Sequence, residues 1–346
     1  MLRTNHRVAV YMDGHMESDY AKMGIGVLRY LPNEIVCVID QVHAGKQTSS
    51  VLNINREVPI VETLEDALRQ GADVLILGIA PSGGKIPESW VSVIELAIDL
   101  GMSIVNGLHD LLNTRFSARI KEPSKQWIWD VRIPQFTPKI ATAKAMSLQN
   151  KRILLVGTDM AVGKMTAGLE ILEWAKTEGI DIRFVATGQI GITIMGTGIP
   201  LDAFKVDHAC GAVETAVMEA ADSDWILIEG QGSLLHPGST ATLPLMRGSC
   251  PTHLILCHHA GKETLRSPEH IKIPDLKAFI ALNEAIATAC GTFPRAKVVG
   301  IAVNTSSLKA DEAKAYIESV EAQTQIPVTD PVRFGAAKLG QAIAND

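Results

Sequence analysis

The middle of the chain reads RILLVGTDMAVGKMT from Arg152 to Thr166. An apolar strand enters a glycine loop, the loop ends on Gly163 and Lys164, and a segment with helical periodicity follows. This order of strand, glycine loop, lysine and helix is typical of a phosphate-binding loop. Glycines let successive N–H groups point inward, the helix N-terminus adds partial positive charge, and Lys164 adds a full charge. The sequence therefore predicts an anion cradle between this strand and this helix.

The loop departs from the common pattern GxxxxGK[ST] in two ways. Five residues instead of four separate Gly157 from Gly163, and Met165 stands where a hydroxyl residue usually follows the lysine. Mg²⁺ prefers oxygen ligands, and a thioether sulfur is a poor one. Thr166 is therefore the metal-binding hydroxyl if Mg²⁺ is used; otherwise the loop holds a phosphate without metal-assisted hydrolysis.

The residues predicted to contact a phosphorylated cofactor come from this loop and from one later strand end. In chain order they are Gly157, Thr158, Asp159, Val162, Gly163, Lys164, Met165, Thr166 and Asn304. Asn304 closes the apolar run AKVVGIAV, and its amide offers a donor and an acceptor that suit a purine ring. A turn-forming role for Asn304 is the alternative.

A second apolar strand ends at Glu229, which a glycine loop follows. A P-loop fold places a carboxylate that orients water or Mg²⁺ at this edge of the sheet. Glu229 is thus a candidate catalytic residue, and a metal ligand only if Mg²⁺ is used. The alternative is a carboxylate that caps a helix or a turn.

Two histidines are candidate bases because imidazole titrates near neutral pH. His236 follows the Glu229 loop, and His208 lies in another segment expected at the same edge. Gln189, Asp207 and Glu214 are candidates for substrate contacts; Asp207 is alternatively a helix N-cap and Glu214 an exposed helix carboxylate. The other histidines lack the HExxH pattern and cysteine partners, which argues against a zinc site.

The first half of the chain alternates short apolar runs with segments of helical period, which indicates a parallel sheet with crossover helices. We predict a Rossmann-like domain over residues 1–121, a connecting segment over residues 122–150 and a P-loop nucleotide-binding domain over residues 151–346. Both domains are therefore expected to be of the α/β class. In the first, the loop of Ser82, Gly83, Gly84 and Lys85 is a second candidate anion site, for substrate; a plain turn is the alternative.

Composition limits the partners. The 346 residues are enough for about two domains, and the net charge of −6, without a basic run, argues against nucleic acid as a partner. No apolar stretch has the length of a signal peptide or a membrane span. The five cysteines are scattered, which fits a reducing cytosol. We expect a cytoplasmic protein with a small-molecule substrate and no membrane partner, for which a homo-oligomer is an open alternative.

Two resemblances sharpen these expectations. The loop from Gly157 to Thr166, with its Thr-Asp start, together with Glu229-Gly230, resembles the P-loop of dethiobiotin synthetase, which uses ATP to activate a carbamate. Over nearly the whole chain, six stretches resemble the DgcN family, whose members combine a Rossmann-like half with a P-loop half. These stretches are ILGIAPSGGKIPESW, GLHDLL, GTDMAVGKMT, ATGQIGI, IEGQGSLLHPG and LCHHAGK.

The DgcN resemblance implies an N-acetyltransferase that moves an acetyl group from acetyl-CoA to D-glutamate or a similar small acidic amine. It implies that the loop holds a CoA phosphate, that amides of residues 230–233 stabilise the oxyanion, and that Lys85, Arg115 or Arg119 pair with substrate carboxylates. The other resemblance implies ATP and a carboxylate- or carbamate-activating ligase. A nucleotide-binding regulator without turnover is the third alternative.

Overall fold

The computed structural model describes residues 2–346. The chain divides into two compact units. Unit 1 contains the residues up to Ile133 together with Gln189–Pro200, and unit 2 contains Pro134–Gly188 and Leu201–Asp346. The expected tandem of two α/β domains is confirmed, because each unit is built on its own parallel sheet.

Unit 1 has a six-stranded sheet of order β3-β2-β1-β4-β5-β6, and every neighbouring pair is parallel. Its strands are short and mostly buried on both faces, as expected for a sheet covered by crossover helices. The strand order reverses direction between β1 and β4, which makes this the topological switch point. The strands are β1 (Arg7–Tyr11), β2 (Glu34–Ile39), β3 (Ile60–Val61), β4 (Val74–Leu77), β5 (Ser103–Asn106) and β6 (Ile128–Asp130).

The helices of unit 1 include one from the second half of the sequence. They are α1 (Lys22–Tyr30), α2 (Leu64–Arg69), α3 (Val91–Asp99), α4 (Leu112–Phe116) and α6 (Gln189–Met195). Gly24 lies inside α1, where its N–H donates to the Gly78 carbonyl at 2.6 Å and a Cβ would approach Met12 Sδ to 2.4 Å. Glycine at this position permits the close approach of helix and strand.

Unit 2 also has a six-stranded parallel sheet, of order β12-β11-β10-β7-β9-β8, and its longest strands are longer than those of unit 1. The strand that carries the phosphate loop, β7, is central, between β10 and β9. The loops after these three strands therefore meet at the same edge of the sheet. The strands are β7 (Lys151–Gly157), β8 (Ile182–Val185), β9 (Trp225–Ile228), β10 (His253–His259), β11 (Lys297–Asn304) and β12 (Val328–Thr329).

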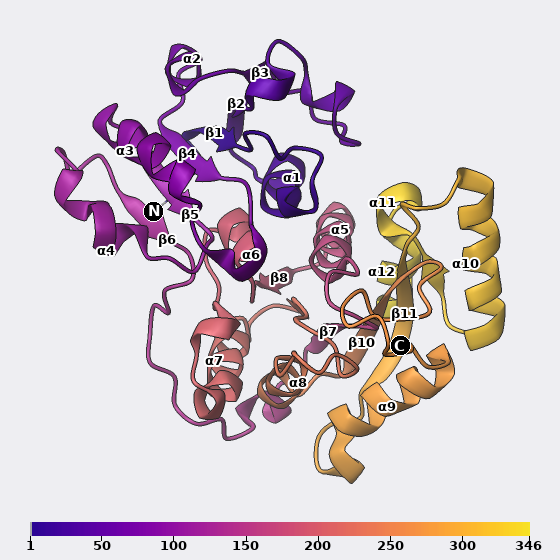
Figure 1. Ribbon diagram of the computed structural model, residues 1–346. Helices are drawn as coiled ribbons and strands as arrows, with labels where there is room; N and C mark the ends of the chain where they lie inside the picture. Colours follow the sequence, from indigo (N-terminus) through magenta and orange to yellow (C-terminus); the bar gives the residue numbers. More distant parts are fainter. Residues whose placement is uncertain (1) are drawn as a thin grey trace. The chain divides into compact units, whose positions relative to one another are not determined.

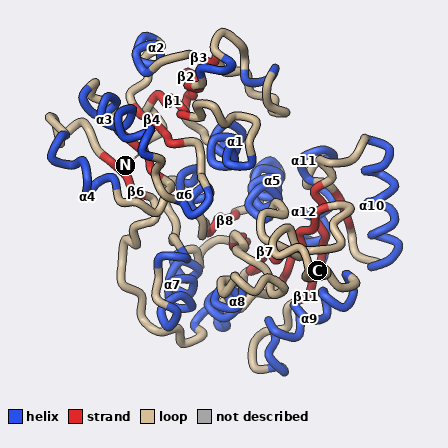
Figure 2. The backbone as a smooth tube through the Cα atoms, viewed as in Figure 1, coloured by secondary structure: helices blue, strands red, loops and turns tan. Residues whose placement is uncertain are grey.

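Helices cover both faces of this second sheet (Figure 2). One group contains α5 (Lys164–Thr177), α11 (Pro331–Phe334) and α12 (Ala337–Asn345), in which α5 contacts both of the others. On the other face α8 (Thr242–Ser249) contacts both α7 (Val206–Glu219) and α9 (Leu276–Thr288). Beside β11 and β12, α10 (Ala310–Thr324) closes the edge, in yellow in Figure 1. This doubly wound arrangement leaves the carboxyl ends of the strands to form a site.

The segment predicted as a connection, residues 122–150, is divided between the two units. β6 pairs with β5 in unit 1, so this unit extends beyond residue 121. From Pro134 onward the chain packs in unit 2, where Lys139 comes so close to α7 that a Cβ on Gly211 would lie 1.7 Å from the Lys139 carbonyl oxygen. A three-residue strand shows no period, which explains why the sequence pattern did not reveal β6.

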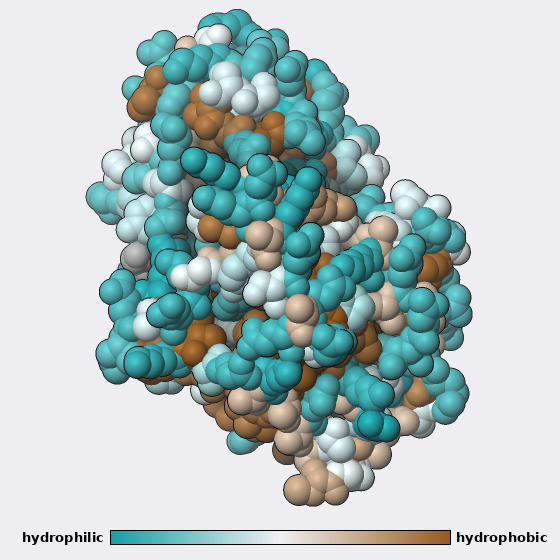
Figure 3. Space-filling view, turned by 90° about the vertical axis from the view of Figure 1, so that its right-hand side faces the viewer, coloured by the Kyte–Doolittle hydropathy of each residue, from teal (hydrophilic) through white to brown (hydrophobic). Residues whose placement is uncertain are grey.

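The face of the molecule in Figure 3 is mostly polar. Figure 3 shows hydrophilic residues over most of the face that it presents, with apolar residues in small separate groups. Among residues 2–346, no helix has the length and apolar composition that spanning a membrane requires.

Candidate phosphate-binding site

The predicted phosphate loop lies between β7 and α5. Its backbone enters the left-handed region at Ala161 (φ 56°) and Gly163 (φ 101°). No atom lies within 4 Å of the point where a Cβ of Gly163 would stand, so Gly163 serves the backbone turn rather than close packing. At Gly157, by contrast, a Cβ would lie 2.9 Å from Val162 Cγ2. The loop thus curls back over the end of its own strand.

Lys164 is the first residue of α5, and its side chain is buried. Its Nζ donates to the Asp159 carbonyl oxygen at 2.9 Å, which is a bond across the loop. Burial lowers the pKa of Lys164 to about 8, although Cys257, Asp159 and Glu229 oppose this shift. A phosphate oxygen would be a stronger acceptor for this ammonium than a neutral carbonyl. The loop therefore holds a buried lysine whose hydrogen-bond partner is a neutral carbonyl oxygen.

Glu229 lies directly after β9 and is also buried. Its Oε2 accepts hydrogen bonds from the backbone N–H groups of Thr187 (2.7 Å) and Gly188 (3.1 Å). Burial raises the pKa of Glu229 to about 7, while these two amides and Lys164 act in the opposite direction. At the next residue, Gly230, a Cβ would lie 2.9 Å from Lys164 Cδ. The structure thus brings the β9 strand end against the stem of Lys164, as the strand pattern predicts.

A buried chain of hydrogen bonds supports the start of the loop. Thr158 Oγ1 and His258 Nδ1 are 3.0 Å apart, and His258 Nε2 lies 3.0 Å from the hydroxyl of Tyr316. The backbone N–H of Thr158 donates to the Cys257 carbonyl at 3.1 Å. Burial lowers the pKa of His258 to about 4, which keeps its ring neutral. This network was not apparent from sequence, because Tyr316 lies far along the chain, on α10.

Asp159 and His236 both bond to the segment that follows β10, at Arg266 and Ser267. Asp159 Oδ2 accepts from the backbone N–H of Arg266 at 2.8 Å, and Oδ1 accepts from the Met160 N–H at 2.7 Å. His236 Nε2 lies 2.5 Å from the Ser267 carbonyl oxygen, and its Nδ1 accepts from the Gly238 N–H at 3.1 Å. Nε2 therefore carries the ring proton and donates it. Both nitrogens of His236 are occupied, so it acts on a substrate only if one bond breaks.

The remaining candidates of unit 2 lie apart from Lys164 in the sheet or on its helices. Asn304 ends β11, which β10 separates from β7, and its Oδ1 accepts from the Ser306 N–H at 3.0 Å. His208 is half-buried in the first turn of α7. Within residues 2–346 its ring makes no hydrogen bond or ion pair. Asp207 is exposed beside it and is not the N-cap, a position that Lys205 occupies.

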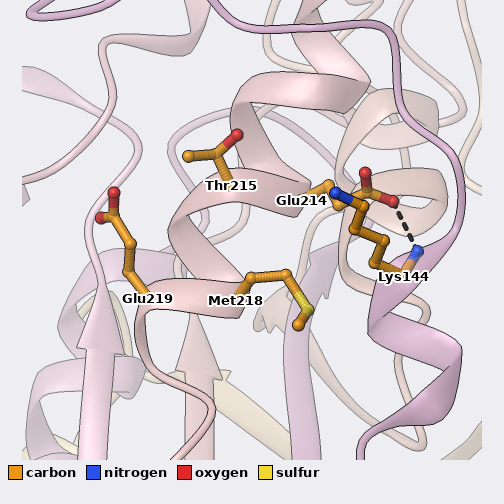
Figure 4. Close-up of a pocket in the computed structure, with 5 residues that line it drawn as sticks. All are labelled: Lys144, Glu214, Thr215, Met218 and Glu219. Atoms are coloured by element: carbon orange, nitrogen blue, oxygen red, sulfur yellow. Dashed lines mark hydrogen bonds between the residues drawn. The ribbon is translucent and has the colours of Figure 1, made fainter.

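Glu214 has a structural role that its sequence position did not reveal. Its carboxylate is buried and accepts from the backbone N–H groups of Thr142 (3.1 Å) and Lys144 (2.7 Å). Figure 4 shows this bond beside a hollow of about 330 Å³. Lys144 and four residues of α7 line the hollow: Glu214, Thr215, Met218 and Glu219. Glu214 thus fastens the segment that leads into unit 2, and the hollow contains no phosphate-loop residue.

The predicted substrate-binding residues belong to unit 1. Gly83 and Gly84 have positive φ in the turn after β4, and the His109 N–H donates to the Gly84 carbonyl at 2.7 Å. The backbone of Ser82 belongs to the same turn, and its side chain lies outside the described part of the structure. Lys85 is exposed. Gln189 begins α6 and packs near Gly107.

The two arginines of unit 1 already have partners. Arg119 donates to Asp99 at 2.7 Å and lies 3.4 Å from Glu95. The guanidinium of Arg115 lies 4.9 Å from the centre of the Phe116 ring. Both side chains are exposed, and such surface contacts contribute little to stability. A substrate carboxylate would therefore compete with Asp99 for Arg119.

The residues around Lys164 fit Mg²⁺ poorly. Met165 presents sulfur, and Glu229 Oε2 already accepts two amide hydrogen bonds. Thr166 is half-buried in the first turn of α5. In the described part of the chain, no three His, Cys, Asp or Glu side chains are grouped to hold a metal.

Comparisons with known proteins agree with this arrangement. Residues 139–340 match the family model "Domain of unknown function (DUF1611_C) P-loop domain", and residues 41–134 match "Domain of unknown function (DUF1611_N) Rossmann-like domain". The crystal structure of a DUF1611 family protein from Anabaena variabilis is similar, with a TM-score of 0.95 and 44% identity, over 99% of this chain and 100% of that one.

Two relatives carry the name D-glutamate N-acetyltransferase. The protein from Tritonibacter scottomollicae is 36% identical over 326 residues, which are 94% of both chains. The protein from Pseudoalteromonas sp is 39% identical over 277 residues, which are 79% of this chain and 82% of that one. The resemblance expected from the sequence motifs is confirmed. The chain belongs to the DUF1611 family, with a Rossmann-like N-terminal domain and a P-loop C-terminal domain.

Proposed function

We propose that this protein transfers the acetyl group of acetyl-CoA to the amine of D-glutamate or a similar small acidic amine. The observation that carries the proposal is the cradle, in which buried Lys164 lies beneath the open turn at Gly163. CoA contains a diphosphate, which suits such a cradle. The names of two relatives at 36% and 39% identity support the choice of reaction.

The reaction sets chemical requirements for the site. The amine nitrogen attacks the thioester carbonyl carbon, a C–N bond forms, and the C–S bond breaks. The attacking nitrogen loses its proton to a base, and the departing sulfur gains one to leave as the thiol of CoA. Backbone N–H groups of residues 230–233 are the candidate donors to the oxyanion that develops on the carbonyl oxygen.

The expected position of the thioester favours one of the candidate bases. The diphosphate and the thioester lie at opposite ends of the pantetheine arm, so a group beside Lys164 does not also reach the thioester. In this proposal Glu229 lies beside Lys164 and favours its charged form against the effect of burial, and His236 holds the loop of Ser267. His208 keeps its ring available, and we assign it the role of the base.

One observation favours a second candidate function. Glu229 stands buried at the end of β9 beside a P-loop lysine, which is where ATP-hydrolysing P-loop enzymes place an essential carboxylate. The ATP-dependent ligase is therefore the alternative. It requires Mg²⁺, which the donor set around Met165 fits poorly.

The test is an assay of purified protein with acetyl-CoA and D-glutamate. We expect free thiol and N-acetyl-D-glutamate to appear in equal amounts, the first followed by a thiol reagent and the second by mass spectrometry. Reactions without amine, and with L-glutamate, are the controls. Phosphate release from ATP and Mg²⁺, without thiol release from acetyl-CoA, would contradict the proposal and support the ligase. Binding of CoA or ATP with neither product would support a regulator.

A further inference from the structure

A hairpin follows β10 at the same sheet edge as the phosphate loop. The Ile273 N–H donates to the Glu263 carbonyl at 2.7 Å, and the Leu265 N–H donates to the Ile271 carbonyl at 2.9 Å. Thr264 and Lys272 form an antiparallel bridge between the two arms. Leu265 is buried, which anchors the first arm. Residues 263–273 are therefore an ordered element of unit 2, here called the 263–273 hairpin.

Two hydrogen bonds fix this hairpin against the loops of the site. The Arg266 N–H donates to Asp159 Oδ2 at 2.8 Å, and the Ser267 carbonyl oxygen accepts from His236 Nε2 at 2.5 Å. Asp159 belongs to the phosphate loop, and its carbonyl oxygen is the present partner of Lys164 Nζ. The backbone of Arg266 and the side chain of Lys164 thus bond to the same residue, Asp159.

The charge of the cradle calls for another cation. A diphosphate carries more than one negative charge near neutral pH, whereas Lys164 supplies one positive charge next to buried Glu229. P-loop enzymes commonly neutralise the excess with Mg²⁺ held by a hydroxyl after the lysine, and this chain has Met165 there. An arginine on a neighbouring loop performs the same neutralisation and binds phosphate oxygens in a bidentate manner.

We propose that Arg266 is a second phosphate-binding residue, which contacts the cofactor diphosphate from the 263–273 hairpin. Its side chain is exposed, and its backbone is bonded to the phosphate loop. This inference rests on the proposed function only in taking a diphosphate as the ligand of the loop. His236 acts as a positioning residue, because it holds the hairpin through Ser267.

The test compares Arg266→Gln with Arg266→Lys and with Lys262→Gln. Lys262 is an exposed cation just before the hairpin, and it serves as the matched control for loss of surface charge. Calorimetric titration with CoA and with ADP at pH 7 measures each dissociation constant. We expect Arg266→Gln to weaken both ligands about tenfold, Arg266→Lys to weaken them less, and Lys262→Gln to change them less than about twofold.

The outcomes distinguish this inference from the proposed function. Absence of CoA and ADP binding by the wild-type protein would defeat the proposed function itself. Tight binding by the wild type with an unchanged Arg266→Gln variant would overturn the role of Arg266 alone. A loss confined to CoA, with ADP unaffected, would place Arg266 at the 3′-phosphate and overturn the assignment to the diphosphate. Because Arg266 is exposed, circular dichroism is expected to show a folded variant.

Discussion

The two units share a parallel sheet, but they use the carboxyl edge of that sheet differently. In unit 1 the buried acids at strand ends are saturated by their own loops. Asp40 accepts from the Gly14 N–H at 2.6 Å, from the His43 N–H at 3.0 Å and from His43 Nδ1 at 2.6 Å. Asp130 accepts from Asn106 Nδ2 and from two backbone amides of α4.

In unit 2 the two buried charges beside the phosphate loop have fewer hydrogen-bond partners than Asp40 and Asp130. Lys164 Nζ donates to a carbonyl oxygen, and Glu229 Oε2 accepts from two amides. Both pKa values move toward neutrality, to about 8 and about 7. Perturbed groups of this kind mark functional sites more often than saturated ones do. The comparison indicates that the number of partners of a strand-end charge, rather than its position, favours Lys164 and Glu229 over Asp40 and Asp130 as candidates for a ligand site.

The largest expected effect is on ligand binding. Lys164→Ala removes the buried cation of the cradle, so we expect the dissociation constant of CoA to rise at least about 100-fold. The matched change in unit 1 is Lys85→Ala, at the exposed lysine of the other glycine turn. We expect it to change that constant less than about threefold. Calorimetric titration measures the dissociation constant of CoA for both variants. Equal effects of the two substitutions would contradict the proposed difference between the two sheet edges.

The next effect is on stability, in unit 1. Asp40→Asn keeps the size of a fully buried side chain but removes an acceptor from His43. Lost hydrogen bonds to a charged acceptor are expected to cost about 2–3 kcal/mol of unfolding free energy. Urea denaturation followed by circular dichroism measures this loss. CoA binding is expected to stay within about twofold, and a variant of normal stability that fails to bind would make Asp40 a ligand residue.

A smaller effect concerns the pH dependence of stability in unit 2. The folded pKa of Glu229, about 7, lies above its ordinary value of 4.5, so the folded state binds this proton more tightly. The contribution of protonated Glu229 to the unfolding free energy is therefore complete below about pH 4.5 and is lost as the pH rises through about 7. Between pH 5 and pH 7.5 we expect the unfolding free energy of the Glu229→Gln variant to fall by about 1–2 kcal/mol less than that of the wild-type protein. Unfolding free energies of the wild type and of Glu229→Gln, measured at pH 5 and pH 7.5, test this expectation. The same change with pH in both proteins would contradict it.

The smallest effect is expected at the hydrogen-bond chain under the phosphate loop. Tyr316→Phe removes the hydroxyl that faces His258 Nε2 while keeping the ring. We expect a loss of about 0.5–1 kcal/mol in unfolding free energy, with CoA affinity nearly unchanged. Thermal and urea denaturation measure the first, and titration the second. A large loss of affinity with normal stability would show that Thr158 depends on this chain for ligand binding.

The strand, glycine loop and helix around Lys164 could be predicted from the sequence because all these parts are local. β7, the glycines, Lys164 and α5 are consecutive, and Glu229 follows a neighbouring buried strand. The fold class followed from the alternation of short apolar runs and helical periods. What sequence spacing does not contain is the set of partners that each polar side chain acquires from distant segments.

Three features were missed for that reason. Glu214 holds backbone amides 70 residues or more away, although its position in a helix pattern suggested a substrate contact or an exposed carboxylate. Helix α6 belongs to unit 1, although it follows a strand of unit 2. The 263–273 hairpin has no strong alternation, and its only sequence signal is the proline at position 268 within a run of polar residues.

We expect the edge of unit 2, and not that of unit 1, to bind a polyphosphate. A crystal structure of the protein with CoA tests this expectation most directly. We predict that the diphosphate lies on the amides around Gly163 and that Lys164 Nζ leaves the Asp159 carbonyl to bind phosphate oxygen. Phosphates bound at residues 82–85 in unit 1, with Lys164 Nζ still on the Asp159 carbonyl, would contradict this expectation.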